Sequence, residues 1–82
     1  MYKKVYYFTA PWCGPCKTFG PIVEESGISV QKVNIDNDTE LAAKYGVRSV
    51  PTLIKINDLG QEIGSRIVGV RSKEDIINWY NG

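Results

Sequence analysis

Two cysteines, Cys13 and Cys16, lie three residues apart in the stretch PWCGPCK, and the chain contains no others. Such a pair can form a structural bridge, hold part of a metal site, stay as unreactive buried thiols, or cycle between dithiol and disulfide. A bridge that closes so short a loop would constrain the unfolded chain by at most about 2 kcal/mol. A structural zinc site needs four ligands, and the chain has only two cysteines and no histidine. We therefore favour a reversible redox centre.

The elements predicted around the pair would position it for this chemistry. A strand is expected to end near Phe8 and a helix to begin around Cys13, so Cys13 would lie in a loop or first helical turn. Unpaired backbone N–H groups and the helix dipole favour negative charge there, which lowers the pKa of a cysteine thiol and raises its reactivity. Cys16 would follow one turn later on the same face, within bridging distance. We expect Cys13 to be the more exposed sulfur and the nucleophile, and Cys16 to resolve a mixed disulfide.

The neighbours of the cysteines suit the same interpretation. Gly14 keeps bulk away from the attacking sulfur, and Pro15 is typical of an early helical position. Trp12 offers a flat apolar platform beside the sulfur, although packing in the core is the alternative for an aromatic residue.

The composition restricts the other functions. The length of 82 residues predicts one domain spanning residues 1–82, and the net charge of +1 argues against binding of nucleic acid through a broad basic surface. The absence of histidine removes histidine-based acid–base catalysis. No apolar run is long enough to span a membrane, so we expect a cytoplasmic protein without membrane contact. We also expect a monomer, because no extra apolar surface stands out. In a reducing cytoplasm a permanent disulfide is disfavoured.

Periodicity and turn signals predict the element order β-α-β-α-β-β-α. The expected strands are residues 4–8, 29–35, 52–57 and 62–68. The first helix is expected at residues 16–26. The second is expected to be capped by Asn37 or Asp38, with Glu40 forming a capping box with Asn37, and the third to be capped by Ser72. The first half reads as a parallel β-α-β unit and the second as a hairpin plus a helix. The fold class is therefore α/β, with one mixed four-stranded sheet and helices on both faces.

Two spaced motifs resemble the thioredoxin family. The segment APWCGPCK at residues 10–17 is similar to the active site of thioredoxins, and VRSVPTL at residues 47–53 is similar to their second signature. NIDND at residues 34–38, Gly46, IVGV at residues 67–70 and the helical Pro21 also fall where thioredoxins have counterparts. The resemblance covers nearly the whole chain and implies a thioredoxin-like fold.

The resemblance also implies roles for individual residues. Cys13 corresponds to the attacking cysteine and Cys16 to the resolving one. Pro51 would follow a cis peptide bond, with Val50 before it offering backbone hydrogen bonds to an extended substrate; a trans proline that opens an edge strand is the alternative. A shallow apolar docking surface would be formed by Trp12, Gly14, Pro15, Val68, Gly69 and Val70.

The implied activity is the reduction of protein disulfides by a thiol–disulfide oxidoreductase. No bound cofactor is needed, because the two cysteines carry the electrons, and no metal is expected. The implied partners are protein disulfides, with ribonucleotide reductase as one family client, and a thioredoxin reductase or another electron donor.

The chain departs from the family in two respects. It begins with what resembles the second thioredoxin strand, lacking the usual first strand and helix, which leaves the four-stranded core shared with glutaredoxins. Tyr7 stands where thioredoxins usually keep a buried aspartate, six residues before the first cysteine, while the lysine that partners it is present as Lys32. A tyrosine cannot act as a carboxylate does, so we expect a functional dithiol with altered proton handling. For Lys32, a solvated strand lysine is the alternative.

Two other functions stay open at this point. A glutaredoxin-like enzyme that uses glutathione would suit the short fold and the missing aspartate, although VGVRSKED lacks the glycine-rich or acidic pattern that holds glutathione in glutaredoxins. A redox-silent binding subunit would use the docking surface without turnover, and the intact cysteine pair argues against it.

Overall fold

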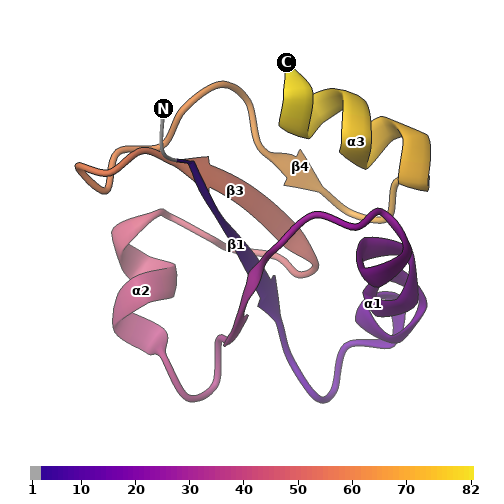
Figure 1. Ribbon diagram of the computed structural model, residues 1–82. Coiled ribbons are helices and arrows are strands. Elements are labelled where there is room, and N and C mark those ends of the chain that lie inside the picture. The colour runs from indigo at the N-terminus through magenta and orange to yellow at the C-terminus, as the bar shows by residue number, and fades with distance from the viewer. Residues whose placement is uncertain (1–2) are drawn as a thin grey trace.

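A computed structural model describes residues 3–82 and has the predicted order of elements (Figure 1). The strands are β1 (Lys4–Thr9), β2 (Gln31–Asn34), β3 (Thr52–Ile56) and β4 (Ile67–Val68); the helices are α1 (Gly14–Glu25), α2 (Thr39–Lys44) and α3 (Lys73–Asn81). The second strand is shorter than the predicted 29–35, because only its centre pairs with β1.

The four strands form one mixed sheet in the order β2-β1-β3-β4. β1 runs parallel to β2 and antiparallel to β3, and β4 pairs antiparallel with β3. Helices α1 and α3 lie on one face of this sheet and α2 on the other (Figure 1). The predicted α/β class, with four strands in one mixed sheet and three helices on its two faces, is therefore confirmed.

The central strands divide the core between the two faces. Val5 and Tyr7 of β1 pack with α1 and α3, whereas Phe8 packs with α2. Successive side chains of a strand point to opposite faces, so a central strand buried on both sides needs a continuous apolar run. The sequence VYYF at residues 5–8 supplies that run.

Side-chain caps begin the second and third helices. Ser72 caps α3 through a hydrogen bond from the Asp75 amide, as predicted. The cap of α2 is Asp38, which accepts from the Leu41 amide at 3.1 Å. The expected pairing of Glu40 with Asn37 was wrong, because a helix that starts at Asp38 places Leu41, and not Glu40, at the third helical position.

The fourth strand is much shorter than the predicted 62–68. Glu62 forms an isolated bridge with Ile56, and the chain then leaves the sheet until Ile67. Gly64 explains the gap, because its φ of +65° is incompatible with an extended strand. The hairpin connection itself is present, with Gly60 at φ +78° in its turn. Only Ile67 and Val68 rejoin the sheet, beside the start of β3.

Lys55 is a buried cation that the sequence pattern did not single out. It lies in the central strand β3 with 6% of its surface exposed, and its ammonium donates to the Trp79 carbonyl at 2.6 Å. Lys3 donates to the Tyr80 carbonyl in the same way. Two cations thus donate hydrogen bonds to carbonyls at the C-terminal end of α3, where the helix dipole favours positive charge. Within residues 3–82, no helix combines the length and apolar character needed to cross a bilayer.

Candidate active site

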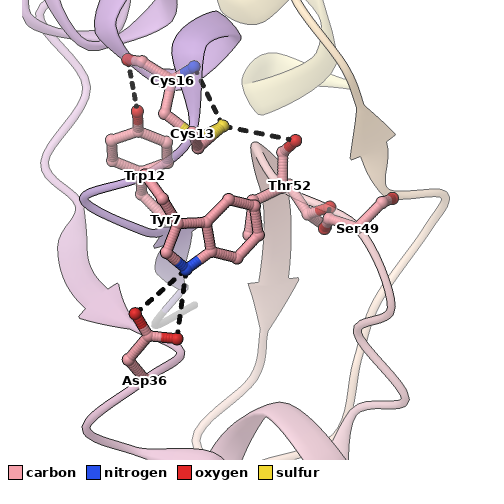
Figure 2. Close-up of a disulfide and its surroundings, with 8 residues drawn as sticks. Tyr7, Trp12, Cys13, Cys16, Asp36, Ser49 and Thr52 are labelled. Atoms are coloured by element: carbon pink, nitrogen blue, oxygen red, sulfur yellow. Dashed lines mark hydrogen bonds between the residues drawn. A yellow bond between two sulfur atoms is a disulfide. The ribbon is translucent and has the colours of Figure 1, made fainter.

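Cys13 and Cys16 form a disulfide at the start of α1, with their Cα atoms 5.3 Å apart. Cys13 is the N-cap of the helix and has an extended backbone, and its Sγ accepts the Cys16 amide at 3.1 Å (Figure 2). Gly14 and Pro15 occupy the first two helical positions, as expected for this motif. In the dithiol form the same amide and the helix dipole would stabilise a Cys13 thiolate.

The exposure predicted for the two sulfurs was wrong. Cys13 is 4% exposed and Cys16 is 5% exposed, so in the disulfide form neither is the more accessible. Both pack in a small cluster with Ala10, against which Ile35 and Val50 also pack. The loop folds over its own disulfide, which spacing along the chain does not reveal.

The peptide bond between Val50 and Pro51 is cis, which agrees with the expectation drawn from the second motif. The alternative of a proline opening an edge strand was wrong, because β3 lies between β1 and β4. Cys13 Sγ lies 3.6 Å from the Val50 carbonyl oxygen, so the proline loop faces the disulfide directly. Gly69 donates its amide to the Pro51 carbonyl at 2.9 Å, which brings the 67–70 segment to the same place.

The large apolar side chains expected to form a docking surface are exposed. Trp12 is 66% exposed, Val68 45% and Val70 39%. Core packing, the alternative for Trp12, is therefore excluded. The Trp12 indole donates to the Asp36 carboxylate, with Nε1 at 3.0 and 3.3 Å from its two oxygens (Figure 2). Sequence analysis missed Asp36 in this role, because nothing in the spacing of residues 24 positions apart signals the contact.

Tyr7 fills the position behind the disulfide. It is 4% exposed, its ring packs edge-on against Phe19 with centroids 6.0 Å apart, and its hydroxyl donates to the Cys16 carbonyl at 3.2 Å (Figure 2). Burial raises the pKa of Tyr7 above its usual 10.0, and a bond from the Thr9 hydroxyl offsets part of the rise. Tyr7 is therefore a neutral group at physiological pH and holds the backbone of the first helical turn.

An open hollow of about 600 Å³ lies between β1, β2 and α1 and reaches the back of Cys16. Tyr7 and Lys32 both line it and are partners in the register of β1 and β2. Side chains opposite each other in a sheet share a face, which is why they meet here. Lys32 is exposed, in agreement with the alternative of a solvated strand lysine, and it borders the same hollow as Cys16.

Because the helix start stabilises a thiolate on Cys13 and Cys16 lies within bonding distance, the pair can exchange with other disulfides. This exchange is the chemistry of a thiol–disulfide oxidoreductase. Among residues 3–82, no three histidine, cysteine, aspartate or glutamate side chains gather in a way that could hold a metal ion.

Comparisons with known proteins agree with this class. The thioredoxin family model matches residues 2–82. The chain is 43% identical over 79 residues to thioredoxin of Chlamydia caviae, covering 90% of this chain and 76% of that protein. It is 41% identical over 80 residues to thioredoxin of Bacillus subtilis, covering 90% and 75%. The solved structure of a mutant thioredoxin from Halobacterium salinarum superposes with a TM-score of 0.81 at 34% identity, covering 93% of this chain and 69% of that one. The chain belongs to the thioredoxin family, and its activity is that of a protein-disulfide reductase.

Proposed function

We propose that Cys13 is the attacking thiolate and Cys16 the resolving one. Cys13 attacks one sulfur of a substrate disulfide, forms a mixed disulfide and releases the first substrate thiolate. Cys16, after losing its proton, attacks Cys13, releases the second thiolate and leaves the Cys13–Cys16 disulfide. Two electrons pass to the substrate, and both released thiolates take up protons. The observation that carries this assignment is the bond from the Cys16 amide to Cys13 Sγ, which favours charge on that sulfur.

The proposed docking surface presents an extended substrate segment to Cys13. Val50 offers its backbone next to Pro51, and its carbonyl oxygen is 3.6 Å from Cys13 Sγ. The apolar contacts would come from Trp12, Gly14, Pro15, Val68, Gly69 and Val70. The exposure of Trp12 and of the two valines supports this role, because exposed apolar side chains grouped around a reactive centre mark a contact site.

The proton of Cys16 leaves, in our proposal, by way of the hollow behind it. Tyr7 is neutral and uses its hydroxyl hydrogen to bond the Cys16 carbonyl, so it supplies no carboxylate to accept the proton. Water in the hollow takes the proton instead, and Lys32 at its border favours the thiolate by its positive charge. Tyr7 is thus a positioning residue for the first turn of α1.

The setting proposed for this chemistry follows from the family. The protein acts as a single domain over residues 1–82 and as a monomer in the cytoplasm. A thioredoxin reductase or a similar donor restores the dithiol in an electron-transport chain, and protein disulfides such as that of ribonucleotide reductase are the clients. The two cysteines need neither a metal nor a cofactor for this transfer.

Trapping of the mixed disulfide tests the assignment of the two cysteines. Pre-reduced Cys16→Ser protein, mixed with an oxidised protein substrate, should accumulate a covalent complex through Cys13, because the resolving thiol is missing. Cys13→Ser should accumulate much less, and the Cys13→Ser, Cys16→Ser double variant none. Electrophoresis without reductant measures the complex. Equal trapping by the two single variants would contradict the assignment, and turnover by the double variant would refute the redox mechanism.

A further inference from the structure

Cationic residues that are scattered along the sequence lie in the three segments that carry the proposed docking residues. These segments are residues 11–16, 48–51 and 67–73. They contain three cationic residues and no acidic one, although the whole chain has 10 cationic and 9 acidic residues and a net charge of +1. The cations are Arg48, Arg71 and Lys73, and all three are exposed, whereas Lys17 lines the hollow behind Cys16. The rest of the chain therefore carries a net negative charge.

Arg71 lies beside the segment that contacts the cis-proline loop. Its guanidinium folds back on its own loop, with Nη1 3.4 Å from the Val70 carbonyl oxygen. A side-chain atom placed on Gly69 would lie 3.9 Å from the same nitrogen. Gly69 itself donates to the Pro51 carbonyl, so the guanidinium stands over the segment that contacts the cis-proline loop. Arg48 adds a second positive charge two residues before Val50.

The acidic groups near this surface leave its cations available. Asp36 contacts the surface from outside the three segments, but both of its oxygens lie within 3.3 Å of the Trp12 indole nitrogen. Glu74 and Asp75 follow Lys73 in the first turn of α3, where the helix dipole favours acids. Within residues 3–82 the one salt bridge joins Arg66 to Glu62 and involves none of these cations. The guanidinium of Arg71 thus keeps donors free for a carboxylate on a bound segment.

We infer that the protein prefers client disulfides flanked by acidic residues, and that Arg71 binds the flanking carboxylate. The inference rests on the proposed reduction of protein disulfides at Cys13 and adds a specificity to it. The occupant of the surface is an extended polypeptide segment with an aspartate or glutamate beside its cystine. Charge complementarity of this kind acts mainly on the rate of association and falls with ionic strength.

The test uses three disulfide-linked peptides that differ in one residue beside the cystine, which is glutamate, glutamine or lysine. Pre-reduced protein is mixed with each peptide, quenched and separated, to give a second-order rate constant. Each constant is divided by that for dithiothreitol, which removes the effect of the flanking charge on the peptide thiols themselves. At low ionic strength the glutamate peptide should react roughly two- to fivefold faster than the lysine peptide, the range expected for exposed charge pairs. The ratio should approach one at about 0.5 M salt.

Two matched variants test whether Arg71 is responsible for the preference for the glutamate peptide. Arg71→Gln should lose most of the ratio between the glutamate and lysine peptides. Lys44→Gln removes the same charge near Gly60, at the opposite end of β3, and should keep the ratio. Equal constants for the three peptides in the unmodified protein, or an unchanged ratio in Arg71→Gln, would overturn the inference while leaving the reductase intact. Failure to reduce any of the peptides would instead refute the proposed function on which the inference rests.

Discussion

The two sides of the disulfide differ in how closely they follow the family. On the side proposed to face the substrate, the Cys13 cap, the cis-proline loop and the exposed Trp12 are as the thioredoxin motifs imply. On the side that faces the sheet, Tyr7 stands where the family resemblance leads us to expect an aspartate, and the hollow beside Lys32 opens to the back of Cys16. Attack on a substrate and release of the Cys16 proton place different requirements on the site. In the proposed mechanism the chain therefore keeps the geometry for attack but releases the Cys16 proton with different groups.

Tyr7→Asp should produce the largest effect, because it tests whether the back of the disulfide has been rebuilt around the tyrosine. The tyrosine ring is buried against Phe19, and an aspartate would leave a cavity where the ring packs and bury a carboxyl group there. We expect a loss of stability of about 3 kcal/mol or more. Urea unfolding measures it.

Tyr7→Phe is the matched control for this loss. It keeps the ring and removes only the hydroxyl that bonds the Cys16 carbonyl, which should cost about 1 kcal/mol. If Tyr7→Asp were as stable as the unmodified protein, the position would still suit the family's carboxylate, and the contrast between the two sides would disappear.

Trp12→Ala tests the side of the disulfide proposed to face the substrate. It should lower the activity while leaving the stability nearly unchanged. Trp12 is 66% exposed, so its loss should change the free energy of unfolding by less than about 1 kcal/mol. The rate constant for a protein disulfide should fall roughly fivefold, as expected when one aromatic contact is removed from a docking surface. Leu59→Ala is the control, because Leu59 is 79% exposed at the distant hairpin turn and should leave the rate unchanged. Equal rates for Trp12→Ala and the unmodified protein would exclude Trp12 from docking.

A smaller effect is expected in the free energy of unfolding at alkaline pH. Burial raises the pKa of Tyr7 above 10.0, so the folded protein holds this proton more tightly than the unfolded chain does. The corresponding stability is fully present below about pH 10 and is lost as the pH rises through the folded pKa. The stability difference between the unmodified protein and Tyr7→Phe should be constant from about pH 7 to 9 and shift against the tyrosine above about pH 10.

Urea unfolding of both proteins across this range measures the difference. Burial and the charge of Lys3 lower the pKa of Lys55, but both proteins contain these lysines, so their titration cancels. A difference that stayed constant up to about pH 11 would contradict the raised pKa of Tyr7.

The sequence predicted those features that depend on local signals. The apolar run at residues 5–8 indicated a central strand, and Ser72 three residues before Asp75 indicated the start of α3. Adjacent residues also determine the Cys13 cap, because Gly14 and Pro15 favour a helix that begins there. The cis bond before Pro51 was expected only from the family resemblance, since the low frequency of cis peptide bonds favoured a trans proline.

Features that depend on tertiary contacts could not be predicted in this way. The burial of Cys13 comes from Ile35 and Val50, which approach from other loops. The bond between Trp12 and Asp36 joins two loops, and the capping of α3 by Lys55 joins a strand to a helix end. The short β4 depends on the backbone of Gly64, because the same residue type can also lie within a strand.

The central claim is that Cys13 and Cys16 form a reductant of thioredoxin type, and their equilibrium reduction potential tests it most directly. Equilibration with glutathione buffers of varied ratio, followed by thiol quantification, gives the value. We predict a potential near about −270 mV, because the side proposed to face the substrate keeps the thioredoxin geometry. A value of about −200 to −230 mV would indicate a glutaredoxin-like enzyme, and one above about −180 mV an oxidant or isomerase. Failure to form the Cys13–Cys16 disulfide at any potential would contradict the account altogether.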